Sequence, residues 1–138
     1  MLIRKFLVTA ALAAAAVPAV AQATPKQTPP CILSEHEIAS VVPYKVDEQI
    51  GKNVIQRVRG AQVYLRAEPG LTAEWLQLNF QRHLAALAGP ATMPDCAFDI
   101  DKVRVDVTSA GPGFWVRLVA PDTKSGEEVL RRAQLLVR

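Results

Sequence analysis

The stretch KVRVDVTSAGPGFWVRLV, residues 102–119, contains the clearest strand pattern of the chain. Val103, Val105 and Val107 alternate with polar residues, which is the period of a strand with one buried face. Gly111-Pro112-Gly113 interrupts the alternation, and residues 114–119 then resume a run of β-forming side chains. The stretch therefore predicts two antiparallel strands joined by a tight turn.

A helix is predicted on each side of this hairpin. Residues 72–88 begin at Thr72, a good N-cap, and Gly89-Pro90 ends their helical pattern. After the hairpin, Ser125 and Glu128 have the spacing of a capping box that opens a second helix. The apolar stripes are Leu76, Phe80, Leu84 and Leu87 in the first helix, and Val129, Leu130, Ala133, Leu136 and Val137 in the second.

The region before the first helix is less regular. Residues 54–66 read as extended, and the parity of their apolar positions shifts at Gly60, which indicates a bulge or a turn between two strands. Further upstream, Ser34 and Glu37 form another capping box, which predicts a short helix over residues 35–42 that ends before Pro43. Residues 44–53 fit neither pattern.

From residue 61 onward the predicted order is strand, helix, strand, strand, helix. This order makes up most of a small ferredoxin-like α+β sandwich, in which both helices cover one face of three to four mostly antiparallel strands. The last strand of the full pattern is missing, and we expect residues 54–59 to replace it as an edge strand. The short N-terminal helix is added to this core. No motif in the chain points to a named family.

The first 23 residues have the composition of a secretory signal peptide. Arg4 and Lys5 precede an uncharged run over residues 6–20, and Ala21-Gln22-Ala23 places small residues before the expected cleavage site. The run is shorter than the roughly 20 residues that a membrane span needs. We therefore expect cleavage near Ala23 and a periplasmic or extracellular protein with no membrane anchor after cleavage.

The remaining chain is long enough for one domain. We divide it into an extended lead-in over residues 24–33 and a single α+β domain over residues 34–138. The formal net charge falls from +3 to +1 once Arg4 and Lys5 are removed. This balance gives no reason to expect nucleic acid as a partner.

The two cysteines of the chain, Cys31 and Cys96, both lie after the predicted leader. An even number of cysteines in an oxidising compartment predicts a disulfide. A cross-link that closes a loop of this length stabilises a protein by about 4 kcal/mol in the chain-entropy model. Cys31 is not placed as a lipid-anchor cysteine, because Thr28-Pro29-Pro30 separates it from the apolar run.

Recognisable catalytic motifs are absent from the sequence. It contains no glycine-rich phosphate loop, no G-x-S-x-G elbow, no H-E-x-x-H and no C-x-x-C. Asp99 and Asp101 form a carboxylate pair, but their place before a strand favours roles in a turn and in solvent. An enzyme is the less favoured class, and it would be built on His83 and a nearby carboxylate.

A copper site is the first specific hypothesis. His83 interrupts the apolar stripe of the first helix, and Met93 and Cys96 follow in the next loop. A closure between Cys31 and Cys96 would bring His36 into the same neighbourhood. Imidazole, thioether and thiolate groups suit copper, although one thiolate would have to remain unpaired. A packed histidine with its ring nitrogen bonded to a carbonyl is the simpler reading.

A binding surface is the second hypothesis. If both helices cover one face of the sheet, alternation places aromatic and basic residues on the other face. These residues are Tyr64 and Arg66 on one strand, Lys102 and Arg104 on the next, and Trp115 and Arg117 on the third. Arginine and aromatic side chains are enriched in binding hot spots. Against this stands an ordinary solvated face, or one that the N-terminal region covers.

The sequence therefore favours an exported, non-enzymatic binding or accessory module of the cell envelope. Its expected partner is an envelope protein, a peptide, particularly an acidic one, or a glycan. The residues expected to bind it are Tyr64, Arg66, Arg104, Trp115 and Arg117. The alternative is a periplasmic copper-binding protein that uses His83, Cys96 and Met93, with His36.

Overall fold

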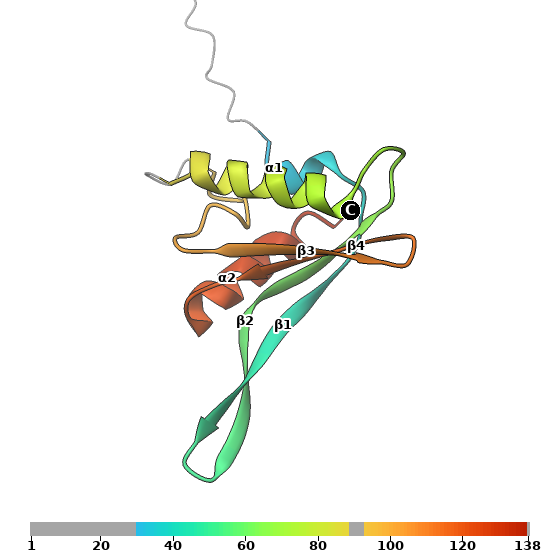
Figure 1. Ribbon diagram of the computed structural model, residues 1–138. Helices are drawn as coiled ribbons and strands as arrows, with labels where there is room; N and C mark the ends of the chain where they lie inside the picture. The colour runs from blue at the N-terminus through green and yellow to red at the C-terminus, as the bar shows by residue number, and fades with distance from the viewer. Residues whose placement is uncertain (1–29, 89–92, 138) are drawn as a thin grey trace, which may run out of the picture.

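The computed structural model describes residues 30–88 and 93–137 of the 138-residue chain. The predicted signal peptide and most of the predicted lead-in lie outside the described residues. None of the described helices is long and apolar enough to cross a membrane. In chain order the elements are the 3-10 turn η1 (Ile32–Glu35), β1 (Ile38–Ile50), β2 (Asn53–Arg66), α1 (Ala73–Ala86), β3 (Arg104–Ala110), β4 (Gly113–Val119) and α2 (Thr123–Gln134) (Figure 1).

The four strands form one antiparallel sheet in the order β1-β2-β4-β3. Val63 pairs with Val116, which pairs with Val107, so the buried residues of three strands share one face. Both helices cover that face, because Leu76 of α1 and Val129 of α2 belong to the same buried core (Figure 1). The predicted α+β class is confirmed. We call the opposite face, which neither helix covers, the open face.

The hairpin predicted from residues 102–119 is confirmed as β3 and β4. Val105 and Val107 point into the core, and Gly111 makes the turn with a φ of +60°. Gly113 already belongs to β4, and a Cβ at this position would overlap the carbonyl oxygen of Leu65. A glycine is therefore required where β4 approaches β2.

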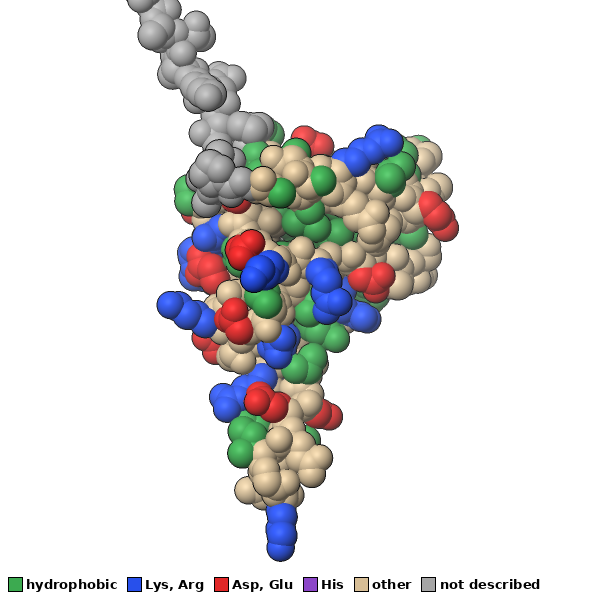
Figure 2. All heavy atoms as spheres, turned by 60° about the vertical axis from the view of Figure 1, so that its left-hand side comes forward, with side chains coloured by type: hydrophobic (Ala, Val, Ile, Leu, Met, Phe, Trp, Pro, Cys, Tyr) green, Lys and Arg blue, Asp and Glu red, His purple; other side chains and the backbone are tan. Residues whose placement is uncertain are grey.

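β1 and β2 extend well past the rest of the sheet. β4 pairs with β2 only over residues 60–66, so residues 45–58 pair with one another alone. The strands reverse at Gly51-Lys52, where Gly51 has a φ of +62°. We call residues 45–58 the arm, and it projects from the body as a narrow spur (Figures 1 and 2).

Gly60 lies where the arm leaves the sheet. The register moves from the pair Tyr44–Gly60 to the pair Lys45–Val58, so Arg59 is the extra residue of a β-bulge. Gly60 has a φ of +153°, and a Cβ there would overlap the carbonyl oxygen of Leu118. The parity shift seen in the sequence is thus a bulge inside one continuous strand.

The helix predicted over residues 35–42 is wrong. The Ser34 hydroxyl donates to the Cys31 carbonyl oxygen (2.6 Å) within η1, and the chain is extended from Ile38 onward. β-branched residues such as Val41 pair with β2, and this pairing outweighs the local capping preference. The prediction of residues 54–59 as the edge strand is also wrong. These residues lie inside β2, and β1 is the edge strand next to it.

The two main helices are confirmed, with one change at the start of the second. The Thr72 hydroxyl oxygen caps α1 by accepting from the Trp75 backbone N–H (3.2 Å). α2 begins before Ser125, because Asp122 is its N-cap and accepts from the Ser125 backbone N–H (2.8 Å). This hydrogen bond lowers the pKa of Asp122. Ser125 is therefore inside the helix and does not cap it.

The predicted disulfide is present between Cys31 and Cys96, whose Cα atoms are 5.1 Å apart. It joins η1, which leads into β1, to the loop that leads into β3. Leu33, two residues after Cys31, is fully buried in the core under the helices. Because Cys31 is bonded to the buried Cys96 and His36 packs against Phe80 of α1, residues 31–36 lie on the helix side of the sheet and do not cover Trp115 on the open face.

Candidate functional site

Rows of paired residues cross the open face of the sheet from β1 to β3. Each row takes one residue from each strand, because the strands pair in register on this face. The open face carries four of the residues that alternation predicted for it: Tyr64, Arg104, Trp115 and Arg117. The rows are Tyr44, Gly60, Val119 and Arg104; Val42, Gln62, Arg117 and Asp106; and Ser40, Tyr64, Trp115 and Thr108.

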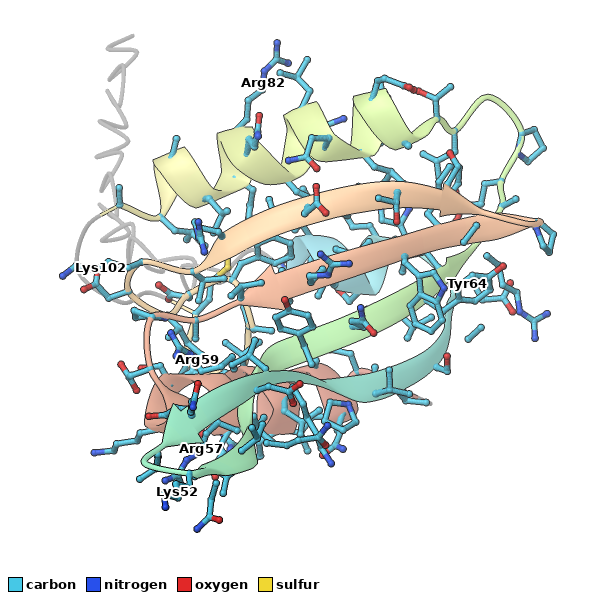
Figure 3. The ribbon with its side chains drawn as sticks, turned by 60° about the horizontal axis from the view of Figure 1, so that its bottom comes forward. Lys52, Arg57, Arg59, Tyr64, Arg82 and Lys102 are labelled. Atoms are coloured by element: carbon cyan, nitrogen blue, oxygen red, sulfur yellow. A yellow bond between two sulfur atoms is a disulfide. The ribbon has the colours of Figure 1, made fainter. Side chains whose placement is uncertain are left out.

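Tyr64 and Trp115 form an aromatic pair in the third row. Their ring centroids are 4.9 Å apart, and both residues are half-buried. Tyr64 is labelled in Figure 3. The Tyr64 hydroxyl donates to the Ala110 carbonyl oxygen (2.9 Å), which fixes the ring. The open face thus presents two large aromatic rings in fixed positions.

Arg117 lies between an aromatic ring and a carboxylate. Its guanidinium carbon is 5.1 Å from the centroid of the Tyr44 ring, and its Nη1 is 3.8 Å from Asp106 Oδ2. Its Nε is buried without a hydrogen-bond partner among the described residues. Tyr44 was not among the residues predicted for this face, because residues 44–53 fit neither a helix nor a strand pattern. The only signal in the sequence is that Tyr44 follows Val42 by two residues, the spacing of neighbours on one face of a strand.

A hollow of about 310 Å³ lies where the first two rows meet. Gly60 contributes no side chain, so nothing in its row stands between Tyr44 and Val119. Arg104 is exposed at the hollow and has no ion-pair partner among the described residues. The hollow therefore combines an aromatic ring with an available cation. Its lining residues are Tyr44, Arg104, Val105, Asp106, Arg117 and Val119.

Two of the predicted basic residues lie at the margins of the face. Arg66 is beyond the third row, and its Nε is 3.2 Å from Glu37 Oε1. Lys102 lies in the turn before β3, with a φ of +59°, at the end of the sheet remote from Tyr64 (Figure 3). The prediction that Lys102 lies on a strand of this face is wrong, because β3 begins at Arg104.

The residues of the copper hypothesis are engaged in other contacts. Cys31 and Cys96 are bonded to each other, so neither offers a thiolate in this state. His36 packs edge-on against Phe80 (6.1 Å), and His83 packs edge-on against Phe98 (5.7 Å). Met93 is buried in the core. Within the described residues, no group of three or more His, Cys, Asp or Glu side chains is arranged to hold a metal ion.

The carboxylates beside His83 have structural contacts. Asp99 is buried rather than solvent-facing, and its Oδ2 accepts from the Met93 backbone N–H. Desolvation by burial lowers the pKa of His83, which favours the neutral imidazole, and Glu35 and Asp99 oppose this shift. Asp101 is exposed, in agreement with the turn role predicted for it.

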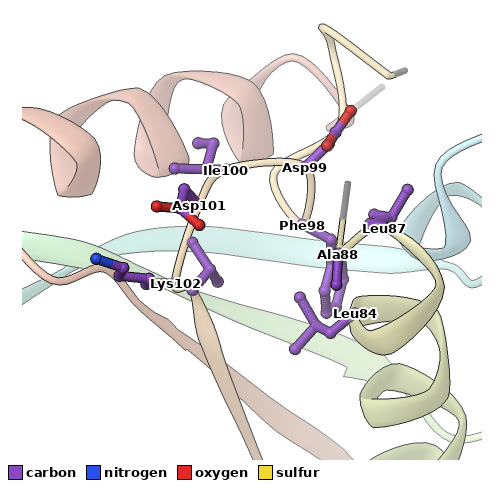
Figure 4. A pocket seen from close by; sticks show the side chains of 9 residues that line it. Leu84, Leu87, Ala88, Phe98, Asp99, Ile100, Asp101 and Lys102 are labelled. Atoms are coloured by element: carbon purple, nitrogen blue, oxygen red, sulfur yellow. The ribbon is translucent and has the colours of Figure 1, made fainter. Parts of the chain in front are cut away.

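A second hollow, of about 620 Å³, lies between the C-terminal end of α1 and the loop before β3 (Figure 4). Leu84, Leu87 and Phe98 line one side, and Asp101 and Lys102 lie at the other. His83 does not line it. The lining of the hollow is mostly apolar, and its charged members are Asp99, Asp101 and Lys102.

No protein-family model, curated protein or solved structure matches this chain.

Proposed function

We propose that the protein is an exported, non-enzymatic binding or accessory module of the cell envelope and that the open face is its binding surface. The observation that carries the proposal is the combination of the Tyr64–Trp115 pair with the hollow beside Tyr44 and Arg104. The predicted signal peptide supports export. The disulfide is compatible with an oxidising compartment, periplasmic or extracellular.

The chemistry of the face favours an anionic ligand with flat or apolar groups. Arg104 supplies a positive charge that has no ion-pair partner among the described residues, and Arg117 adds a second one that Asp106 at 3.8 Å only partly balances. Tyr64 and Trp115 provide rings on which a sugar or a side chain can stack. An acidic peptide, an anionic envelope glycan or a protein with an acidic surface has the matching properties.

The fold is consistent with the finer assignment of a ferredoxin-like sandwich. β2, α1, β3, β4 and α2 follow the order of the first five elements of that fold. In this assignment β1 occupies the edge position next to β2 that the missing last strand would fill. The open face then corresponds to the helix-free face of the sandwich.

The intrinsic fluorescence of Trp115 provides a direct test. Trp75→Phe leaves Trp115 as the single tryptophan of the chain. We expect a glutamate-rich peptide or polygalacturonate to change the Trp115 emission, and neutral dextran to leave it unchanged. Arg104→Ala should weaken the response about tenfold, because a charge-assisted contact is lost. Arg82→Ala, on the outer side of α1, is the matched control (Figure 3).

The proposal fails if no anionic probe changes the Trp115 emission at millimolar concentration, or if Arg82→Ala and Arg104→Ala weaken the response equally.

The copper hypothesis makes a separate prediction for protein purified in the same way. Protein purified without reductant or chelator would then have free thiols and bound copper, and His83→Ala would lose the metal. A native mass that fits the oxidised chain without an adduct contradicts it.

A further inference from the structure

The two edges of the sheet differ in how their backbone groups are used. At the β3 edge, the Gln77 side chain of α1 donates to the Val105 carbonyl oxygen (3.0 Å) and accepts from the Val107 backbone N–H (2.7 Å). These two bonds occupy groups that would otherwise be open to a further strand. The fold itself thus closes this edge.

The β1 edge has no such closure. Within residues 30–88 and 93–137, no side chain is hydrogen-bonded to the backbone of β1. Pro43 removes one donor, as is common on edge strands. The strand continues for seven residues beyond Pro43, up to Ile50, and leaves unpaired backbone groups along the arm.

The side chains along this edge include exposed apolar residues on the side of the open face, next to Glu48, which is ion-paired with Arg57 (3.4 Å), and unpaired charged residues on the other side. Val42 is 38% exposed and Ile50 is 49% exposed. Lys45 and Asp47 point to the opposite side by alternation, are exposed, and have no ion-pair partner in the described part of the chain. An exposed edge that combines these features is a template for another strand.

We propose that a second copy of this chain pairs with β1, antiparallel, about a two-fold axis at Val46. In this register Lys45 lies opposite Asp47 of the second copy, and Asp47 lies opposite Lys45. Val42 lies opposite Ile50, and Val46 lies opposite Val46. The pairing thereby covers both exposed apolar side chains and neutralises both free charges.

The neighbouring symmetric registers are less favourable. An axis at Lys45 would place the two Lys45 side chains opposite each other, and an axis at Asp47 would do the same with the two aspartates. Like charges directly opposite each other destabilise a strand pair. Charge complementarity therefore selects the axis at Val46. The outer edge of the β2 half of the arm carries only Arg57 as a charge and offers no such match.

The dimer would contain a continuous eight-stranded sheet. A two-fold axis that relates antiparallel edge strands runs perpendicular to the sheet, so the open faces of both copies point to the same side. The arm, which is only two strands wide in a single copy, would gain two more strands beside it. A pair of strands alone is marginally stable in water, and a wider sheet removes that weakness.

Cross-linking tests the axis directly. We expect Val46→Cys to form a disulfide-linked dimer in air, because residues at the axis of an antiparallel pair have Cα atoms at a separation that a disulfide spans. Thr108→Cys, exposed on β3 at the closed edge, should remain monomeric at the same concentration. Equal cross-linking of the two variants would overturn the proposal.

Charge exchange tests the register in the full oxidised protein. Sedimentation should show a dimer of the wild type, and Asp47→Lys should weaken it at least about tenfold, because both cross-copy pairs become repulsive. Lys45→Asp combined with Asp47→Lys should restore it, and Asp101→Lys should leave it unchanged. A wild type that remains monomeric at about 100 μM, where specific pairing is populated for a micromolar dissociation constant, overturns the second copy as occupant. The edge would then be left for an extended segment of another protein.

Discussion

The two edges of the sheet, at β3 and at β1, differ in whether their outer backbone groups have hydrogen-bond partners. β3 has seven residues, lies beside α1, and has two of its backbone groups bonded to Gln77. β1 has thirteen residues, and its second half extends beyond the sheet as part of the arm. One edge is completed within the chain, whereas the other is left unpaired.

The comparison shows that edge protection depends on what packs beside the strand. Both edge strands contain alternating charged residues, so their sequences alone do not distinguish them. α1 contacts β3 directly and places a side-chain amide at its edge, while α2 contacts mainly β2 and reaches β1 little.

Removal of the disulfide should cause the largest loss of stability among these variants, and it concerns both edge strands. It joins the segments that lead into β1 and β3, and it closes a loop with a sequence separation of 65 residues. Cys31→Ser combined with Cys96→Ser should lower the free energy of unfolding by about 4 kcal/mol. Urea unfolding followed by circular dichroism measures this loss. An equal stability of the oxidised protein and the double variant would contradict it.

Gly60→Ala should damage the point where the arm leaves the sheet. The added Cβ overlaps the carbonyl oxygen of Leu118, so the bulge must shift, and we expect a loss of about 3 kcal/mol. Gly51→Ala is the matched control, since open space surrounds that residue and only its positive φ is strained, at about 1 kcal/mol. Similar unfolding midpoints for the two variants would refute a special role of Gly60.

Gln77→Leu should open the closed edge. The Val105 carbonyl and the Val107 N–H lose their partner, and because these hydrogen bonds are part-buried we expect a loss of about 1 kcal/mol. The variant should also self-associate through β3, as measured by sedimentation. Gln81→Leu, one turn further along α1 and exposed, controls for the added apolar surface. A Gln77→Leu protein as stable as the control would show that the amide does not protect the edge.

Acid should weaken the Glu128 ion pairs that help to hold the loop before β3. Arg131 and Arg132 hold the pKa of Glu128 at about 2, and Arg132 also donates to the carbonyl oxygens of Cys96 and Asp99. Because the folded pKa lies below the ordinary value of 4.5, this contribution is present above pH 4.5 and is lost as the pH falls toward about 2.

The effect is the smallest of the series, below about 1 kcal/mol, because the ion pairs are partly exposed. The melting temperatures of the wild type and Glu128→Gln should differ near neutral pH and converge toward pH 2. Glu127→Gln, exposed on the same helix, should follow the wild type throughout. A difference that stays constant down to pH 2 would contradict the assignment.

The parts of the fold that were predicted correctly rest on local patterns. The alternation at Val103, Val105 and Val107, the glycine turn, the cap at Thr72 and the parity shift at Gly60 each leave a signal within a few residues. The helix predicted over residues 35–42 failed because its capping box was a local preference, which the long-range pairing of β1 with β2 outweighed.

The candidate site divides in the same way. Alternation was enough to place Tyr64, Trp115, Arg104 and Arg117 on one face once the helices were assigned to the other. Tyr44 was missed because its strand was not recognised. The bonds of Gln77 were not predictable, since a glutamine on a helix has the same local sequence whether it faces water or a strand edge.

Inspection of the residues alone was enough to predict the α+β class, the β3–β4 hairpin, the two helices and the pairing of Cys31 with Cys96. These features follow from periodicity, turn residues and cysteine count, which act over short distances or need no geometry. Three features could not be predicted without the folded structure: the edge strand formed by residues 38–50, the arm that leaves the sheet at Gly60, and the bonding of Gln77 to one edge of the sheet. Those outcomes depend on residues far apart in the chain, whose contacts compete with local preference and prevail when more surface and more hydrogen bonds are satisfied together.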